Sequence, residues 1–111
     1  MDDCLFCKIY QGKVPSKKVY EDDNVFAFHD IHPLAATHVL FIHKKHTANV
    51  NGLSTIHVGQ VFTAIKNFTT GSDLERNGFR IVTNTGADAG QTVFHAHFHL
   101  LGGEKLAGFG R

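Results

Sequence analysis

Five short stretches of the chain are rich in β-branched and aromatic residues or alternate polar with apolar residues, which predicts strands. Between the third and the fourth stretch, apolar residues recur at mostly helical spacing over residues 53–70. Ser54 is the expected N-cap of this helix, and Gly71 and Ser72 mark its end. The predicted strands are residues 17–21, 25–30, 37–43, 79–84 and 95–101.

The order of these elements predicts an α+β fold. A short helix within residues 4–10 comes first, followed by a β-hairpin, a strand, the long helix and two further strands. This order predicts an antiparallel sheet of about five strands with one long and one short helix. Such a small sheet has an exposed edge, which invites pairing with a second copy of the chain.

Length, composition and charge narrow the class of protein. With 111 residues, 42% of them hydrophobic, and no linker or repeat, residues 1–111 are expected to form a single globular domain. The net charge is +1 with neutral histidines, so nothing argues for a nucleic-acid or membrane surface. No stretch approaches the ~20 apolar residues of a membrane span, and the N-terminus is acidic. We therefore expect a cytoplasmic protein.

The last predicted strand carries an unusual row of imidazoles. His95, His97 and His99 alternate with apolar residues, so in a continuous strand they would share one face while the apolar residues enter the core. Histidine changes charge near neutral pH, and nine histidines in a chain this short are a compositional outlier. The pattern predicts a site where one imidazole attacks a substrate; the alternative is a half-buried strand with incidental histidines.

A short loop precedes the histidine row. Gly86 and Gly90 permit positive φ angles and a close approach of backbone N–H groups to a ligand. Gln91 and Thr92 add side-chain donors where the loop meets the strand. Donors beside nucleophilic imidazoles suit a phosphoryl group, whereas the loop taken alone is an ordinary hairpin connection.

The chain has two cysteines, Cys4 and Cys7, in a Cys-x-x-Cys pair. In a reducing compartment such a pair indicates metal or redox chemistry, but no strand precedes it as in a thioredoxin-type motif. Tetrahedral zinc needs four ligands and binds Cys and His readily, so two histidines would have to complete the site. The alternative is a pair of reduced, partly buried thiols.

Residues 95–101, His-Ala-His-Phe-His-Leu-Leu, resemble the signature of the histidine triad (HIT) superfamily. The preceding Gly90-Gln91-Thr92-Val93-Phe94 and the following Gly102-Gly103 resemble its Hint branch, and the likeness extends over nearly the whole chain. The resemblance implies a homodimer that hydrolyses purine nucleoside phosphoramidates, such as AMP-amine or AMP-lysine compounds, or related AMP anhydrides. A nucleotidyl-histidine would be the intermediate.

The same resemblance implies catalytic roles for particular residues. His97 matches the nucleophile, which a hydrogen bond from its other ring nitrogen should hold in one tautomer. His99 and His38 would stabilise the charge on the phosphoryl oxygens. Thr92 stands at the family's serine position near the leaving group, where it or an imidazole would deliver a proton. His95 would support His97 rather than act as an acid or base.

The resemblance also implies a substrate pocket. Apolar and aromatic side chains would cover the purine base, and Asp30 would accept hydrogen bonds from the ribose hydroxyls. Taken singly, each apolar residue could instead belong to the core, and Asp30 could cap its own turn. The expected substrate-binding residues are Phe6, Ile9, Phe28, Asp30, Ile31, Asn84, Gly90, Gln91, Thr92, His97 and His99.

By the same resemblance, His46 and His95 would complete a zinc site with Cys4 and Cys7. Four protein ligands leave no open position, so the zinc would be structural and not required for the chemistry. His43 replaces a proline of the family's Pro-Lys-Lys-His stretch, which makes it a conceivable substitute ligand.

Three other functions stay open. The first is hydrolysis of dinucleoside polyphosphates, another activity of the superfamily. The second is a metalloenzyme in which the His-x-His pair binds a catalytic metal. The third is a nucleotide-binding protein without catalysis, in which the histidine row would have no chemical task.

Overall fold

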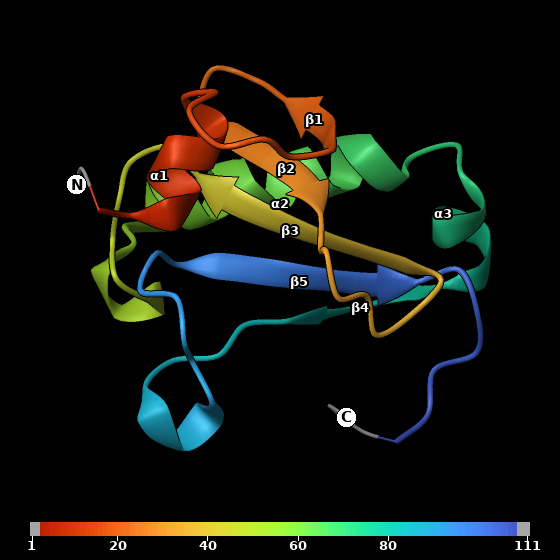
Figure 1. Ribbon diagram of the computed structural model, residues 1–111. Helices are drawn as coiled ribbons and strands as arrows, with labels where there is room; N and C mark the ends of the chain where they lie inside the picture. The colour runs from red at the N-terminus through yellow and green to blue at the C-terminus, as the bar shows by residue number, and fades with distance from the viewer. Residues whose placement is uncertain (1–2, 109–111) are drawn as a thin grey trace.

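The computed structural model describes residues 3–108 and contains one five-stranded antiparallel sheet in the order β1-β2-β3-β5-β4 (Figure 1). Each predicted strand is present, and the third begins and ends where the sequence predicts. The strands are β1 (Lys18–Glu21), β2 (Val25–His29), β3 (Thr37–His43), β4 (Phe79–Val82) and β5 (His97–Gly102). The helices are α1 (Leu5–Tyr10), α2 (Thr55–Thr69) and α3 (Asp73–Asn77), with single 3₁₀ turns at Val50–Gly52 and Ala87–Ala89.

The register of the central strands determines which side chains meet. β3 lies between β2 and β5, with Leu40 opposite His99 and Ile42 opposite His97. Opposed residues of an antiparallel pair project from the same face, and alternate residues of a strand share that face. His38, two residues before Leu40, therefore projects from the same face as His97 and His99.

Each face of the sheet carries its own hydrophobic core. On one face, Phe41 and Leu100 pack in a cluster with Val61 and Ile65 of α2, which runs behind the sheet in Figure 1. On the other face, α1 contributes to a second cluster that also contains the side chains of β2 and β3 beside the histidine row. That second cluster consists of Phe6, Ile9, Phe26, Phe28, Leu40 and Ile42.

The long helix begins as predicted but ends differently. Ser54 is its N-cap, because its hydroxyl oxygen accepts a hydrogen bond from the His57 N–H (3.1 Å). After Thr69 the chain turns and forms α3, which the sequence analysis did not predict. Ser72 caps α3 by accepting from the Leu74 N–H (3.2 Å), and Leu74 is buried. A helix of five residues is too short to show a periodic apolar pattern.

Two of the strands are shorter at one end than predicted, and the residues just beyond that end form hydrogen bonds outside the strand ladder. The last strand was predicted to start at His95 but starts at His97, since the Ala96 N–H donates to the Thr47 carbonyl (2.7 Å). The fourth ends at Val82 rather than at residue 84, and next to it the Thr83 hydroxyl donates to the His97 carbonyl (2.8 Å).

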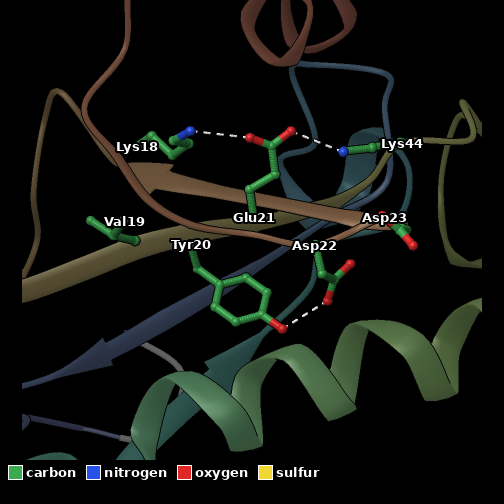
Figure 2. Close-up of a pocket in the computed structure, with 7 residues that line it drawn as sticks. All are labelled: Lys18, Val19, Tyr20, Glu21, Asp22, Asp23 and Lys44. Carbon is green, nitrogen blue, oxygen red and sulfur yellow. Dashed lines mark hydrogen bonds and ion pairs between the residues drawn. The ribbon is translucent and has the colours of Figure 1, made fainter.

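A hollow of about 600 Å³ beside the β1–β2 hairpin is lined mainly by charged side chains (Figure 2). The Glu21 carboxylate lies 2.9 Å from the Lys44 ammonium and accepts a hydrogen bond from Lys18 (3.1 Å), and these contacts hold the pKa of its carboxyl below the usual value. The Tyr20 hydroxyl donates to Asp22 (2.7 Å). Lys18 and Lys44 thus pair with Glu21, and the hollow contains none of the predicted site residues.

In the part of the chain that the structure describes, residues 3–108, no helix combines the length and the apolar character needed to cross a membrane.

Candidate functional site

His97 lies at the start of β5 with its ring held in one orientation. Its Nδ1–H donates to the backbone carbonyl of His95 (2.8 Å), as predicted for the nucleophile. The ring of Phe6 meets it edge-on, with the centroids 5.1 Å apart. Burial lowers the pKa of His97, although the carbonyl contact and the charge of Asp30 act in the opposite direction. A neutral ring with its proton on Nδ1 leaves a lone pair on Nε2, as nucleophilic attack requires.

A chain of hydrogen bonds orients His38 and His99. The Leu34 N–H donates to His38 Nδ1 (3.0 Å), so a neutral His38 carries its proton on Nε2. That nitrogen lies 2.9 Å from His99 Nδ1, which must accept the proton. His99 therefore carries its own proton on Nε2, where it can donate to an anionic ligand.

The electrostatic surroundings keep this pair of rings neutral. Burial lowers the pKa of His99 to about 4, and the neighbouring His97 and His38 act in the same direction. Burial also lowers the pKa of His38, against the opposing charge of Asp30, whose Oδ2 lies 3.5 Å from His38 Nε2. Asp30, His38 and His99 have the residue types and spacing to hold a metal ion. In the hydrogen-bonded arrangement, however, two of the candidate nitrogens share one proton.

His95 does not join the row, which corrects the prediction that it shares a face with His97 and His99. Its ring is 1% exposed and turns toward the N-terminal end of α1. Its Nδ1 lies 3.4 Å from Cys4 Sγ, 3.5 Å from Cys7 Sγ and 3.2 Å from His46 Nδ1. We call Cys4, Cys7, His46 and His95 the cysteine–histidine cluster.

The geometry of this cluster fits a tetrahedral metal. Zn–S bonds of about 2.3 Å and Zn–N bonds of about 2.0 Å place sulfur and nitrogen ligands about 3.5 Å apart and two nitrogens about 3.3 Å apart. The observed separations of 3.2–3.5 Å agree with these values. His95 Nε2–H donates to the His43 carbonyl (2.8 Å), which leaves Nδ1 as the ligand atom. The residues present therefore fit a zinc ion.

Beside the histidine row, a hollow of about 720 Å³ contains Asp30, Ile31 and His38 in its lining. Asp30 Oδ1 accepts from the His32 N–H (2.7 Å), so this carboxylate caps its own turn, while Ile31 is 85% exposed. The other expected base-covering residues, Phe6, Ile9 and Phe28, are all buried in the core cluster on this face of the sheet. Of the predicted pocket residues, Asp30 and Ile31 therefore line an open hollow, whereas Phe6, Ile9 and Phe28 lie in the core.

The loop before the histidine row comprises residues 86–92, and we call it the glycine loop. The predicted substrate-binding residues in and beside it differ in exposure. Gly90 adopts φ +83°, a left-handed conformation, and is exposed, as is Thr92. Asn84 lies half-buried before the loop, and Thr92 lines a separate hollow of about 390 Å³ beside Cys4 and His46. Gln91 is predicted to bind substrate, and its side chain is buried and bonded within the protein.

Similarity to known proteins identifies the family. A family model described as HIT domain matches residues 11–106. The chain belongs to the HIT family. Among the relatives of this HIT chain is purine nucleoside phosphoramidase of Escherichia coli, which is 38% identical over 108 residues. The aligned region spans 95% of this chain and 91% of that protein.

Solved HIT structures share this architecture. A HIT family hydrolase from Legionella pneumophila superimposes with a TM-score of 0.89 at 41% identity, covering 95% of this chain and 96% of that chain. A histidine triad protein from Clostridium difficile gives a TM-score of 0.92 at 39% identity, covering 98% and 97% of the two chains. The five-stranded sheet and the long helix are therefore the HIT fold.

His43 is excluded as a substitute metal ligand in this HIT protein. It alternates with Phe41 on the α2 face, where its Nε2–H donates to Gln60 Oε1 (2.7 Å) and its ring lies 4.4 Å from that of His57. Strand alternation places His43 on the face opposite the one that carries His38. The position of His43 within the strand therefore already indicated that it would not be a substitute ligand.

Two contributors to the site were not predicted. The Leu34 N–H determines the tautomer of His38, and the Thr83 hydroxyl bonds the carbonyl of His97. Leu34 acts through its backbone, so its side chain gives no signal in the sequence. Thr83 gives no signal either, because a threonine at the end of a strand is common.

Proposed function

We propose that this HIT protein hydrolyses purine nucleoside phosphoramidates, including AMP-amine and AMP-lysine compounds, or related AMP anhydrides. The observation that carries this proposal is the orientation of His97, whose Nδ1–H bonds the His95 carbonyl at 2.8 Å and leaves Nε2 as a nucleophile. The name of the Escherichia coli relative, purine nucleoside phosphoramidase, supports the choice of substrate class.

In the first step, His97 Nε2 forms a bond to the α-phosphorus while the bond from phosphorus to the leaving nitrogen breaks. The leaving amine takes a proton, for which the Thr92 hydroxyl and the imidazoles are the candidate donors. The His99 Nε2–H donates to a phosphoryl oxygen, and His38 holds His99 in the tautomer that can do so.

In the second step, water attacks the same phosphorus and the bond to His97 Nε2 breaks. AMP leaves, and the ring returns to its starting state, with its Nδ1–H still donating to the His95 carbonyl. Attack by water requires loss of a proton, which the amine or a neighbouring imidazole can accept.

The hollow that contains Asp30 and Ile31 would hold the nucleoside. Asp30 Oδ2 is the oxygen available to the ribose hydroxyls, because Oδ1 already accepts from the His32 N–H. In this proposal Phe6, Ile9 and Phe28, which belong to the core cluster on this face of the sheet, would support the purine base. Asn84, Gly90 and Thr92 would offer donors to the phosphate.

Zinc in the cysteine–histidine cluster would supply structure rather than a chemical step, since four protein ligands leave no open position. Within this proposal, His95 connects the two sites. Its Nδ1 faces the cluster, while its carbonyl oxygen orients His97.

The test is mass spectrometry of the intact protein, quenched during turnover of an AMP phosphoramidate. We expect an added AMP mass in the wild type and none in His97→Ala, together with a loss of turnover of at least about 10³-fold. His57→Ala, a half-buried histidine on α2, is the matched control and should retain both adduct and turnover. Full turnover by His97→Ala would refute the assignment of the nucleophile.

The same assay separates the alternative functions. Faster turnover of a dinucleoside polyphosphate than of the phosphoramidate would favour the other HIT activity. Immediate loss of turnover on chelation, in protein that keeps its fold, would favour the metalloenzyme in which the His-x-His pair binds a catalytic metal. AMP binding that His97→Ala leaves intact, with no turnover in either protein, would favour a nucleotide-binding protein.

We further propose that the protein is a homodimer. β4 is an edge strand of the sheet, and the aromatic side chains of Phe79 in β4 and Phe62 on α2 are 36% and 39% exposed. Sedimentation equilibrium should give twice the chain mass of 12.3 kDa. Phe79→Lys should shift the distribution toward the monomer, whereas Ile31→Lys, on the rim of the nucleoside hollow, should not.

A further inference from the structure

The side chain of Gln91 is buried at 6% exposure and uses its whole amide within the protein. Its Oε1 accepts from the Gly86 N–H (2.9 Å), and its Nε2 donates to the carbonyls of Ala48 (2.6 Å) and Val93 (3.1 Å). One donor faces the oxygen and two acceptors face the nitrogen, so the orientation of the amide is fixed. Both N–H groups are occupied, and neither is left for a phosphate.

These bonds close the glycine loop upon itself. The Gln91 N–H also donates to the Gly86 carbonyl (3.1 Å), so Gly86 and Gln91 bond each other through both backbone and side chain. Gly86 and Gly90 both adopt φ +83°, which a residue with a Cβ rarely does. The positions of Gly90 and Thr92 therefore depend on where the amide of Gln91 is held.

The Ala48 carbonyl connects this loop to the cysteine–histidine cluster. Ala48 lies two residues after His46, whose Nδ1 is 3.5 Å from Cys7 Sγ. Between them, the Thr47 carbonyl accepts from the Ala96 N–H (2.7 Å), which joins the same segment to the backbone between His95 and His97. Residues 46–48 thus touch the cluster, the histidine row and the glycine loop.

We propose that Gln91 is a positioning residue that couples metal binding at the cysteine–histidine cluster to AMP binding at the glycine loop. A metal bound by His46 holds residues 46–48 in place, and the Ala48 carbonyl then fixes the amide that closes the loop. This inference rests on the proposed function, because it takes the glycine loop to bind the phosphate of AMP.

The coupling has a quantitative consequence. If zinc tightens the binding of AMP by some factor, AMP must tighten the binding of zinc by the same factor. For a local coupling of this kind we expect a factor of about 5- to 20-fold in the wild type. Gln91→Met keeps a similar volume but removes all three side-chain hydrogen bonds, so the factor should fall to about 1.

The experiment measures both affinities in a cycle. Isothermal titration gives the dissociation constant of AMP with and without zinc, and competition with a chromophoric chelator gives that of zinc with and without AMP. The proteins are wild type, Gln91→Met and Ala48→Gly, which keeps Gln91 but loosens the carbonyl it bonds. Gln60→Met, which removes a half-buried amide on α2, is the matched control and should keep the wild-type factor.

Each outcome decides between the alternatives. A factor that is lost in Gln91→Met, reduced in Ala48→Gly and kept in Gln60→Met supports the proposal. AMP binding that does not depend on zinc in the wild type, or a full factor in both Gln91→Met and Ala48→Gly, overturns it while the proposed function stands. Global unfolding of the zinc-free wild type in far-UV circular dichroism also overturns it, because the coupling would then not be local. No AMP binding to the zinc-loaded protein would overturn both proposals.

Discussion

His95 and His97 are separated by one residue, yet their rings contact different groups. His95 Nδ1 faces the sulfurs of Cys4 and Cys7, whereas His97 lies on the sheet beside Phe6. Alternation predicts a shared face only while the strand is continuous, and the Ala96 N–H leaves the sheet for the Thr47 carbonyl. The sequence identifies both residues as functional candidates, but the local backbone decides what each ring contacts.

Gln91 shows that the type of a residue does not by itself decide which groups its side chain bonds. An amide beside glycines is a sound candidate for a phosphate ligand, since it carries two N–H donors. Whether those donors face a ligand or the protein depends on the carbonyls of Ala48 and Val93, which are supplied by the backbone and carry no sequence signal.

Burial of the imidazoles predicts that mild acid destabilises the fold. The folded-state pKa of His99 is about 4, and that of His38 is also lowered from 6.5. Between about pH 6.5 and pH 4 the unfolded chain therefore binds more protons than the folded chain, so the free energy of unfolding falls as the pH drops through this window. Urea unfolding at about pH 7 and about pH 5 measures the change.

His99→Asn tests whether this residue contributes to that slope. Removing one group that takes up a proton on unfolding should reduce the slope by as much as about 1.4 kcal/mol per pH unit. The remaining slope belongs to the other buried histidines. The same pH dependence in His99→Asn as in the wild type would contradict the assignment.

At the scale of elements, the sequence predicted what has a clear period or a strong terminal signal. The strand over residues 37–43 has both ends correct, and Ser54 caps α2 as expected. Boundaries that depend on a hydrogen bond from a distant segment were wrong by one to two residues, as at His97 and Val82. The short helix α3 was missed because its five residues are too few to show a periodic apolar pattern.

The cap of α2 predicts a measurable loss of stability. Ser54→Ala removes the acceptor of the His57 N–H and should lower the free energy of unfolding by about 1 kcal/mol. Urea denaturation measures this loss, and turnover per folded molecule should not change. Thr63→Ala, an exposed position within the same helix, is the matched control and should be neutral or slightly stabilising. Equal losses in both variants would show that the cap has no special role.

At the scale of the whole molecule, the cysteine–histidine cluster joins segments that are far apart in the sequence. Cys4 and Cys7 come from the start of α1, His46 follows β3, and His95 precedes β5. A metal bound here would connect α1 to the sheet beside the histidine row. A ligand that binds only the folded state stabilises it, so metal removal should weaken the whole fold.

Zinc should raise the midpoint of thermal unfolding by about 10 °C or more at saturating metal. Differential scanning calorimetry of the chelated and the zinc-loaded protein measures this shift. Cys7→Ser loses one of the four ligands and should show a much smaller shift, whereas His57→Ala, outside the cluster, should keep it. A full shift in Cys7→Ser would place the metal elsewhere.

The sequence by itself determined the fold class, the order of the elements and the two groups of residues that carry chemistry. It could do so because periodicity, turn residues and the histidine and cysteine spacing are local properties of the chain. Only the tertiary structure decided that the ring of His95 leaves the row, which tautomers His38 and His99 adopt and which way Gln91 points. Those outcomes depend on backbone carbonyls and N–H groups from distant segments, such as the carbonyl of Ala48 and the N–H of Leu34, which every residue type offers alike.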